Sequence, residues 1–300
     1  MNKMTKSLVI CNINESSTKD VQQVGGKGLS LIELSRMGVN VAPGFVLTTR
    51  VFDEFISANK LDSLFSKDVA QINVKDIKQL KTHFNSADFP ESIKSDIVNM
   101  TKRLSLNNSK LIVRSSATIE DGGKHSFAGQ FDTILEVSPD QLIPAIKAMY
   151  LSLLNPHALM YMQYRGIDHR MVKMGVIVQE FIKTDFAGVV FTVDPISKNN
   201  KHMIIEYISD LGEELMIGNK EPIAYIIDKG DFSLINKTIP KKEAEKQEME
   251  PSVLLELSKI TLQIEKRFGT GMDIEWGIKN RILYVFQARP ITSSLIRRET

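Results

Sequence analysis

Residues 273–289, DIEWGIKNRILYVFQAR, decide the fold at the C-terminal end of this sequence. Two runs of alternating residues flank a polar Lys-Asn-Arg stretch, and this pattern is typical of a β-hairpin. A two-residue loop at Lys279–Asn280 would mix polar and aromatic side chains on each face. A three-residue loop at 280–282 separates them, and we expect this register because a slip of one residue exchanges the faces. The polar pairs that it creates are Glu275 with Gln287 and Asp273 with Arg289.

The expected register divides the hairpin into an apolar and a polar face. The apolar face should hold Ile274, Trp276, Ile278, Tyr284, Phe286 and Ala288. The polar face is either an ordinary solvent-exposed surface or a platform of oxygen ligands. A carboxylate and an amide oxygen, from Glu275 and Gln287, suit Mg²⁺, which usually also holds substrate phosphates. Arg289 beside them would bind a phosphate through its planar fork of donors.

The stretch GGKG at 25–28 is the second chemical signature. It predicts a turn before a helix that ends at Gly38. It is not a P-loop, because that motif needs glycine where Val21 stands and Ser or Thr where Gly28 stands. Lys27 is therefore either a surface lysine in a flexible turn or a phosphate contact beside the free N–H groups of a helix start.

Arg114 follows the apolar run Leu-Ile-Val at 111–113, which predicts a buried strand. The loop at 122–129, GGKHSFAG, comes soon after it. Glycines would let the loop backbone approach and cover an anion that Arg114 also holds. A plain glycine turn between two strands is the alternative.

Two further stretches hold ambiguous polar residues. In VQEFI, at 178–182, a strand pattern is interrupted by Gln179 and Glu180. This strand could offer exposed backbone to an adenine edge and a carboxylate to ribose hydroxyls, or it could be an ordinary edge strand. Glu213, in the stretch LGEELMIG, is either a solvated charge or a ligand contact.

The composition describes a soluble globular protein rather than a disordered or membrane-spanning one. Of its 300 residues, 42% are hydrophobic and 25% are charged. The net charge of +2 gives no reason to expect a nucleic-acid partner. No apolar run approaches the about 20 residues of a membrane span. A single cysteine, Cys11, leaves no internal disulfide, so we expect a reducing, cytoplasmic location.

The pattern of elements predicts three subdomains. These are an N-terminal α/β subdomain with the GGKG motif at 1–110, a glycine-loop subdomain at 111–180, and a C-terminal subdomain with the hairpin at 181–300. The segment 237–251 is charged and bounded by prolines, which indicates a solvated excursion or a lid element.

Six motifs in order resemble the ATP-binding domain of the phosphoenolpyruvate synthase and pyruvate phosphate dikinase family, and rifampin phosphotransferases look similar. They are GGKG at 25–28, VRSSATIED at 113–121, SFAGQFDT at 126–133, VQEFI at 178–182, LGEELMIG at 211–218, and DIEW with QARP within 273–290. The match runs over about residues 20–293. The resemblance implies an α+β fold, a variant of the ATP-grasp fold, with mixed and antiparallel sheets, flanking helices and the nucleotide in a cleft between subdomains. Asp210 departs from the family, which usually has glycine before LGE.

The resemblance also implies roles for individual residues. The catalytic contacts with the phosphates of ATP would come from Lys27, Arg114 and Arg289. Nucleotide binding would fall to Gly129, Thr133, Gln179, Glu180, Ile182 and Glu213. Mg²⁺ would be held by Glu275 and Gln287, the pair that the hairpin register brings together.

In this family the β-phosphoryl group of ATP passes to a histidine on a swivelling domain, AMP is left, and a third domain delivers the phosphoryl group to a small-molecule acceptor. Full-length members continue beyond the QARP motif, and none of the five histidines here has the glycine-rich context of the phosphorylated one. We therefore expect either an excised domain or one subunit of a split enzyme, with the phosphohistidine carrier elsewhere.

Two other functions remain open at this point. An ATP-grasp ligase would form an acyl phosphate on a carboxylate substrate and release ADP. A catalytically silent nucleotide-binding module would only regulate a partner. The presence of all five key polar residues, Lys27, Arg114, Glu275, Gln287 and Arg289, counts against the silent module.

Overall fold

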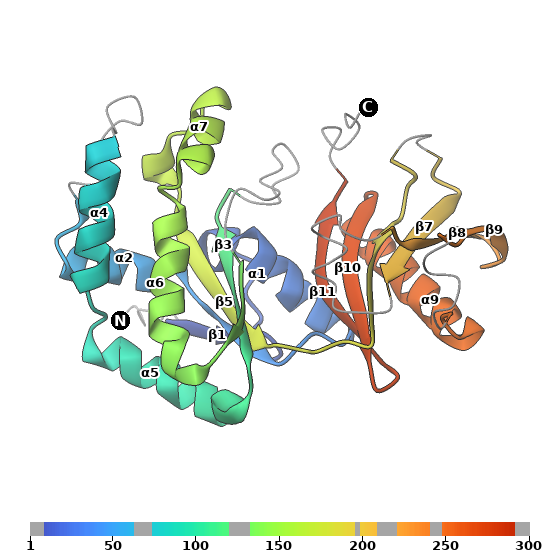
Figure 1. The fold of residues 1–300 in the computed structure, drawn as a ribbon, viewed down its shortest axis with the longest axis horizontal. Coiled ribbons are helices and arrows are strands. Elements are labelled where there is room, and N and C mark those ends of the chain that lie inside the picture. Colours follow the sequence, from blue (N-terminus) through green and yellow to red (C-terminus); the bar gives the residue numbers. More distant parts are fainter. Residues whose placement is uncertain are drawn as a thin grey trace, which may run out of the picture. The chain divides into compact units, whose positions relative to one another are not determined.

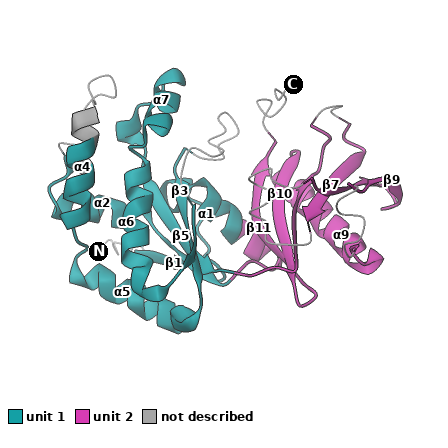
Figure 2. Ribbon diagram, in the orientation of Figure 1, with its two compact units in different colours: residues 1–32, 43–181 teal, residues 33–42, 182–300 magenta. Residues whose placement is uncertain are grey.

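The computed structural model describes residues 9–62, 74–119, 133–195, 199–208, 221–240 and 248–291 (Figure 1). The chain divides into two compact units (Figure 2). Unit 1 comprises residues 1–32 and 43–181, and unit 2 comprises residues 33–42 and 182–300. Among the described helices, none combines the length and the hydropathy that a membrane crossing needs.

Unit 1 is built on a five-stranded sheet with the strand order β1-β2-β5-β3-β4. Its strands are β1 (Ile10–Asn12), β2 (Gly44–Leu47), β3 (Leu111–Ala117), β4 (Thr133–Val137) and β5 (Met174–Glu180). Strand β5 pairs with β2 on one side and with β3 on the other. It lies inside the sheet, so the edge-strand interpretation of VQEFI is wrong. Its apolar run explains this position, because a strand covered on both faces needs no polar alternation.

Helices pack against one face of this sheet around an aromatic cluster. They are α2 (Thr49–Ala58), α4 (Val74–Ser86), α5 (Glu91–Arg103), α6 (Leu142–Ser152) and α7 (Pro156–Tyr164), with the short 3₁₀ helices η2 (Leu106–Asn108), η3 (Pro139–Gln141) and η4 (His169–Met171). The ring centroid of Phe55 lies 4.6 Å from that of Phe89 and 5.7 Å from that of Tyr150. Alternate residues of β3, including Leu111 and Val113, point into this core. The intervening residues of β3, among them Arg114, therefore point to the opposite face.

Helix α1 (Val21–Arg36) contains the GGKG stretch, whereas the sequence predicted that this stretch is a turn before the helix. The helix begins at Val21 and is broken at Gly25, whose φ and ψ are 72° and 173°. The expected end at Gly38 is confirmed, since Gly38 has a φ of 76° and its N–H donates to Ser35 O at 3.0 Å. The turn predicted at 25–28 is thus a break inside a longer helix.

Unit 2 is built on a six-stranded sheet with the order β11-β10-β6-β7-β8-β9. Its strands are β6 (Phe186–Phe191), β7 (His202–Ile208), β8 (Ile223–Asp228), β9 (Leu234–Thr238), β10 (Met272–Lys279) and β11 (Ile282–Pro290). Helix α9 (Pro251–Phe268) starts with proline in its first turn and ends at Gly269, whose φ is 70°. Strands β8 and β9 were not expected from the sequence. Strand β9 also enters the predicted charged excursion, of which 241–247 lie outside the described residues.

The segment 33–42 belongs to unit 2 although it is distant from the rest of that unit in sequence. Val285 N donates to Asn40 O at 2.9 Å, and Arg267 forms an ion pair with Glu33 at 2.6 Å. These contacts attach the segment to strand β11 and helix α9.

The expected α+β class is confirmed. All strand pairs among the described residues are antiparallel. The mixed sheet that was also expected is therefore not found among these residues. The three-subdomain division at 110 and 180 stays a prediction. Strands from the first two predicted subdomains share the sheet of unit 1.

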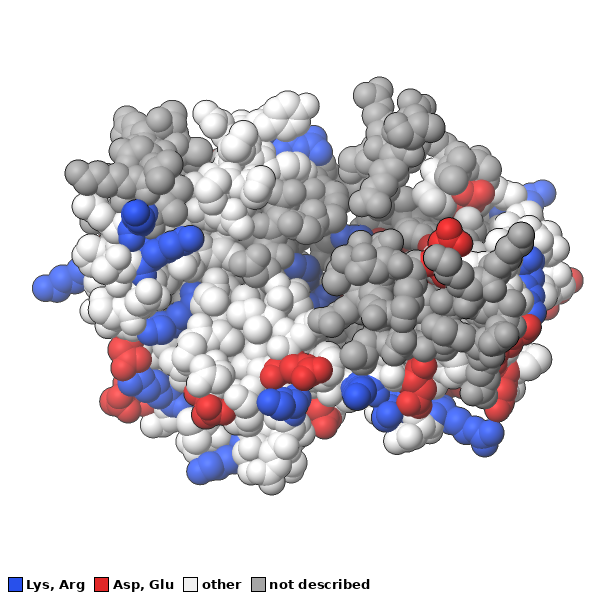
Figure 3. All heavy atoms as spheres, viewed as in Figure 1, with Lys and Arg blue, Asp and Glu red and all other residues white. Residues whose placement is uncertain are grey.

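Charged side chains of both signs are interspersed on the face drawn in Figure 3. Several of them form ion pairs, such as Arg103 with Glu15 and Lys94 with Glu91. Exposed pairs of this kind contribute little to stability. The mixture agrees with the near-neutral net charge.

Candidate functional site

The β10–β11 hairpin carries the first group of expected site residues. Asp273 lies opposite Arg289 and Glu275 lies opposite Gln287, as the alternation of the sequence predicted. Directly opposite residues of an antiparallel pair project to the same face, with Cβ atoms about 5 Å apart. The two polar pairs therefore lie next to each other on one side of the sheet.

The hairpin loop differs from the one expected. Lys279 pairs with Ile282, so the loop has two residues, Asn280 and Arg281, rather than the three at 280–282. Both have positive φ, 50° and 65°, as a type I′ turn requires. The pairing shifts between Glu275 and Trp276, which leaves Phe286 as an extra residue on β11. This β-bulge restores the expected polar pairs despite the shorter loop.

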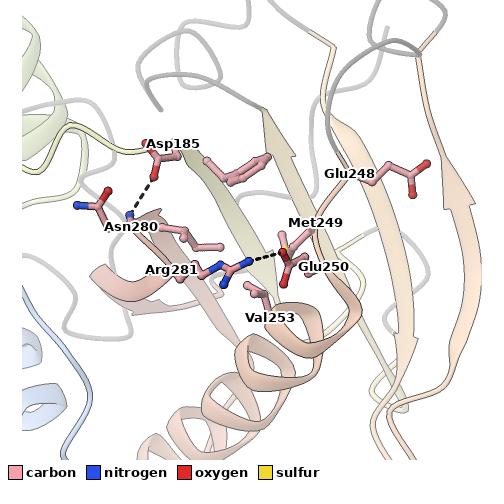
Figure 4. A pocket seen from close by; sticks show the side chains of 9 residues that line it. Asp185, Glu248, Met249, Glu250, Val253, Asn280 and Arg281 are labelled. Atoms are coloured by element: carbon pink, nitrogen blue, oxygen red, sulfur yellow. Dashed lines mark hydrogen bonds and ion pairs between the residues drawn. The ribbon is translucent and has the colours of Figure 1, made fainter.

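Side chains outside the hairpin hold its loop in place (Figure 4). The Asp185 carboxylate accepts from Asn280 N at 2.9 Å and pairs with Lys279 at 2.9 Å. Arg281 pairs with Glu250, beside the start of α9, at 3.2 Å. Neither loop residue is glycine, and the hydrogen bond from Asn280 N to Asp185 supports the left-handed backbone there.

The bulge also changes the composition of the two faces. Ile274, Trp276, Ile278 and Ala288 are buried, as expected for the apolar face. Leu283 and Val285 are buried on the same face, because Ile278 pairs with Leu283 and Trp276 pairs with Val285. The assignment of Tyr284 and Phe286 to this face is wrong. Tyr284 lies opposite Gly277, and the Phe286 ring fills the space above Gly277, so both lie on the face of Glu275.

The polar face of the hairpin is not an ordinary solvent-exposed surface. Asp273 is 3% exposed and Gln287 is 5% exposed. The Arg289 guanidinium donates through Nε and Nη2 to Asp273 Oδ2, at 2.9 and 2.7 Å. Burial strengthens such a pair and fixes the orientation of the arginine. Arg289 is therefore held by Asp273 beside Glu275 and Gln287.

Glu206 on β7 is a member of this face that the sequence analysis missed. Glu275 pairs with Val189 of β6, and Val189 pairs with Glu206, so all three side chains lie in one row across the sheet. Burial, and then the negative charge of Asp273, raise the pKa of the Glu206 carboxyl. The available signal was a lone carboxylate in the apolar strand HMIIEYI. Its neighbours depend on strand pairings that the sequence does not reveal.

The donor set of this face fits Mg²⁺. Glu275 offers carboxylate oxygens and Gln287 an amide oxygen, which are the hard ligands that Mg²⁺ takes together with waters and phosphates. Among the described residues, no group of three or more His, Cys, Asp or Glu side chains is placed to hold a metal. Magnesium would neutralise phosphate charge on this face.

Unit 1 carries a separate group of expected site residues, at strand β3. Arg114 is 7% exposed and pairs across the strands with Thr133, the first residue of β4. Lys27 Nζ lies 3.4 Å from both the carbonyl oxygen and the hydroxyl of Ser115. Lys27 therefore contacts β3 at the residue after Arg114, and Arg114 pairs with Thr133 where the described pairing with β4 ends.

The end of β5 carries the residues expected to bind adenosine. The N–H of Glu180 donates to Pro43 O at 2.9 Å, and that of Phe181 donates to Lys110 O at 2.8 Å. The expected exposed backbone is therefore absent at these two N–H groups. Gln179 is buried, while Glu180 Oε1 accepts from Ser109 at 3.1 Å. Glu180 and Ile182 are half-buried, and the three nucleotide contacts remain predictions.

Two expected site residues, Gly129 and Glu213, lie outside the described residues, as does the glycine loop at 122–129. The other residues fall into two groups. Lys27, Arg114, Thr133, Gln179 and Glu180 lie in unit 1, and Ile182, Glu275, Gln287 and Arg289 lie in unit 2.

Comparisons with known proteins agree on one family. The family model described as "Pyruvate phosphate dikinase, AMP/ATP-binding domain" matches residues 21–299. A probable phosphoenolpyruvate synthase of Methanocaldococcus jannaschii is 33% identical over 313 residues, which cover 94% of this chain and 26% of that protein. Rifampicin phosphotransferase of Bacillus subtilis is 29% identical over 316 residues, which cover 96% of this chain and 36% of that protein. The chain thus spans less than half the length of these two relatives.

The solved structure of D-alanine–D-alanine ligase from Helicobacter pylori is a more distant likeness. It is 10% identical, and the match covers 92% of this chain and 56% of the ligase, with a TM-score of 0.39. A TM-score this low carries no inference about the activity of the chain.

Proposed function

Since the chain belongs to the pyruvate phosphate dikinase AMP/ATP-binding domain family, we propose that it binds ATP with Mg²⁺ and transfers a phosphoryl group in an ATP-dependent phosphotransferase. Histidine on a separate domain or subunit is the immediate acceptor. A histidine nitrogen bonds to the β-phosphorus, the bond from that phosphorus to the oxygen bridging the α-phosphate breaks, and AMP leaves with the electron pair, so the histidine first holds the β- and γ-groups together. Water then attacks the γ-phosphorus, the bond from the γ-phosphorus to the β,γ-bridging oxygen breaks, and inorganic phosphate departs, which leaves the β-phosphoryl group on the carrier. The carrier then delivers the phosphoryl group to a small molecule.

The observation that carries this proposal is the buried polar face of the β10–β11 hairpin. Glu275 and Gln287 lie opposite each other, and Arg289 is oriented by its partly buried ion pair with Asp273. An oxygen-ligand pair beside an oriented guanidinium is suited to a metal-bound phosphate. Arg289 would therefore bind a phosphate oxygen, and Glu275 with Gln287 would hold Mg²⁺.

In unit 1, we assign positive charge for phosphate binding to Lys27 and Arg114. Phosphoryl transfer depends mainly on positioning and on neutralising the charge of the phosphate oxygens. Thr133, opposite Arg114, adds a hydroxyl donor from the first position of β4. We assign the adenosine to Gln179, Glu180 and Ile182, with further contacts from Gly129 and Glu213.

The test uses ATP labelled separately at the β and γ positions, with Mg²⁺ and with or without a histidine-domain protein of this family. Label from the β position on the carrier, together with AMP, is the expected result. Production of ADP with a carboxylate substrate would replace this function with that of an acyl-phosphate ligase. Binding of ATP without turnover under both conditions would leave a regulatory nucleotide-binding module.

A further inference from the structure

The hydroxyl of Ser116 occupies a gap in helix α1. In a continuous α-helix, the N–H of Gly28 would donate to the carbonyl of Val24, four residues earlier. Here the Gly28 N–H donates to Ser116 Oγ at 2.9 Å, and Ser116 Oγ donates to Val24 O at 2.7 Å. One side chain from β3 thus satisfies both backbone groups that the break at Gly25 exposes.

The surrounding backbone keeps the gap open. Gly25 has a φ of 72° and a ψ of 173°, a region that is essentially restricted to glycine. A Cβ atom on Gly25 would lie 2.0 Å from Ser116 O, so the helix backbone lies directly on β3. On the neighbouring strand, a Cβ atom on Gly175 would lie 2.9 Å from Val24 O. The Val24 carbonyl is therefore confined between Gly175 and Ser116 and cannot readily turn back to Gly28.

Lys27 lies within the segment that this hydroxyl holds. It directly precedes Gly28, whose N–H is bound to Ser116, and its own Nζ lies 3.4 Å from Ser115 O. Arg114 is two residues before Ser116 on the same strand and, by alternation, on the same face. The orientation of the Lys27 side chain relative to β3 thus depends on how the Gly25–Gly28 backbone is fixed.

We propose that Ser116 is the positioning residue of Lys27: its hydroxyl replaces the helical hydrogen bond between Gly28 and Val24 and holds the broken helix on β3. Ser116 is completely buried, so it acts through the Gly28 backbone and not by touching a ligand. This inference rests on the proposed function in one respect, which is that the proposed function gives Lys27 a phosphate to bind.

The test compares Ser116→Ala and Ser116→Cys with Ser152→Ala. Cysteine nearly preserves the volume of serine but bonds weakly through its sulfur, so a loss in both Ser116 variants cannot be a cavity effect. Ser152 is the matched control, because it is a buried serine of the same unit whose hydroxyl donates to a backbone carbonyl, Met149 O, at 2.7 Å.

The first measurement is the affinity for ATP with Mg²⁺, determined by calorimetry in a double-mutant cycle with Lys27→Ala. Both Ser116 variants should weaken binding about tenfold, and Ser116→Ala should add less than about twofold once Lys27 is already alanine, because contributions through one shared group are not additive. Ser152→Ala should bind as the unmodified chain does. Equal losses with and without Lys27 would reduce Ser116 to a structural residue and overturn the proposal.

The second measurement does not depend on ATP. Hydrogen exchange at the Lys27 and Gly28 amides should become about tenfold faster or more in Ser116→Ala and stay unchanged in Ser152→Ala. Unchanged exchange in Ser116→Ala would overturn the proposal. If the unmodified chain fails to bind ATP, the proposed function is wrong, and the exchange result alone decides the role of Ser116.

Discussion

The β10–β11 hairpin and the broken helix α1 place polar groups by different physical means. In the hairpin, cross-strand pairing puts Glu275 opposite Gln287, and the buried apolar side chains of Ile274, Trp276 and Ile278 point to the other face. In α1, the backbone at Gly25 lies directly on β3, and the hydroxyl of Ser116 enters the helical ladder. The hairpin therefore separates stability from chemistry, whereas the α1 break uses the same atoms for both.

Trp276→Ala gives the largest expected effect and tests the apolar side of this separation. Trp276 is 1% exposed, and its ring lies against Gly188 and near Tyr207. Its truncation should lower the free energy of unfolding by about 3–5 kcal/mol. Chemical denaturation measures the loss, with Ile282→Ala, an exposed residue of the same hairpin, as the control. A loss no larger than that of the control would mean that this face does not stabilise the sheet.

Glu275→Ala tests the polar side. The half-buried carboxylate takes part in the proposed Mg²⁺ site and not in the apolar core. ATP turnover should fall by about 100-fold or more, as happens when a preorganised charge at a reacting centre is removed. The free energy of unfolding should change by less than about 1 kcal/mol. Glu256→Ala, at an exposed position on α9, serves as the control. Parallel losses of stability and turnover would show that the two faces of the hairpin do not have separate roles.

Gly25→Ala tests the break in helix α1, where we expect stability and ATP binding to be lost together. The backbone conformation and the contact with Ser116 O both oppose a Cβ atom, so the free energy of unfolding should fall by about 3 kcal/mol, at the upper end for such strain. ATP affinity should fall with it. Gly166→Ala is the matched control, since Gly166 has a φ of 66° but open space around its Cβ position, and it should cost about 1–2 kcal/mol. Equal effects at the two glycines would remove the close approach as an explanation.

Glu206→Gln gives the smallest expected effect and concerns pH. Burial and the charge of Asp273 raise the pKa of the Glu206 carboxyl in the folded state. Its contribution to stability is therefore full below the unfolded pKa and is lost as the pH rises through the folded pKa. Glutamine does not ionise, so the stability of the variant relative to the unmodified chain should increase from about pH 4 to about pH 7.

Melting temperatures across that pH range measure the trend for Glu206. The exposed Glu256→Gln should show a constant difference from the unmodified chain. A constant difference for Glu206→Gln as well would show that the pKa of its carboxyl is not raised in the folded state.

The hairpin shows how far a sequence pattern reaches. The pairs Asp273–Arg289 and Glu275–Gln287 could be predicted because alternation along a strand has a fixed period of two. The bulge at Phe286 could not be predicted, because the shorter loop with a bulge and the longer loop without one give the same polar pairs. Two side chains, Tyr284 and Phe286, were consequently assigned to the wrong face.

The residues of unit 1 show the opposite limit. The motif GGKG predicted a lysine at a helix start, but the break at Gly25 arises from contact with β3, about ninety residues later in the chain. The same holds for Glu206, whose role depends on the pairing of three strands. Neither signal exists within a short window of sequence.

The sequence by itself determined the α+β class, the polar pairs of the hairpin, the family, and which polar residues are candidates for ATP and Mg²⁺. These features follow from periodicity, turn chemistry and ordered motifs, all of which are local. Only the tertiary structure decided which side chains meet: Ser116 with the α1 backbone, Asp273 with Arg289 as a partly buried pair, and Glu206 with the hairpin row. Such contacts join segments that are distant in the chain, and their energy comes from close packing and burial, which exist only once the sheets have formed.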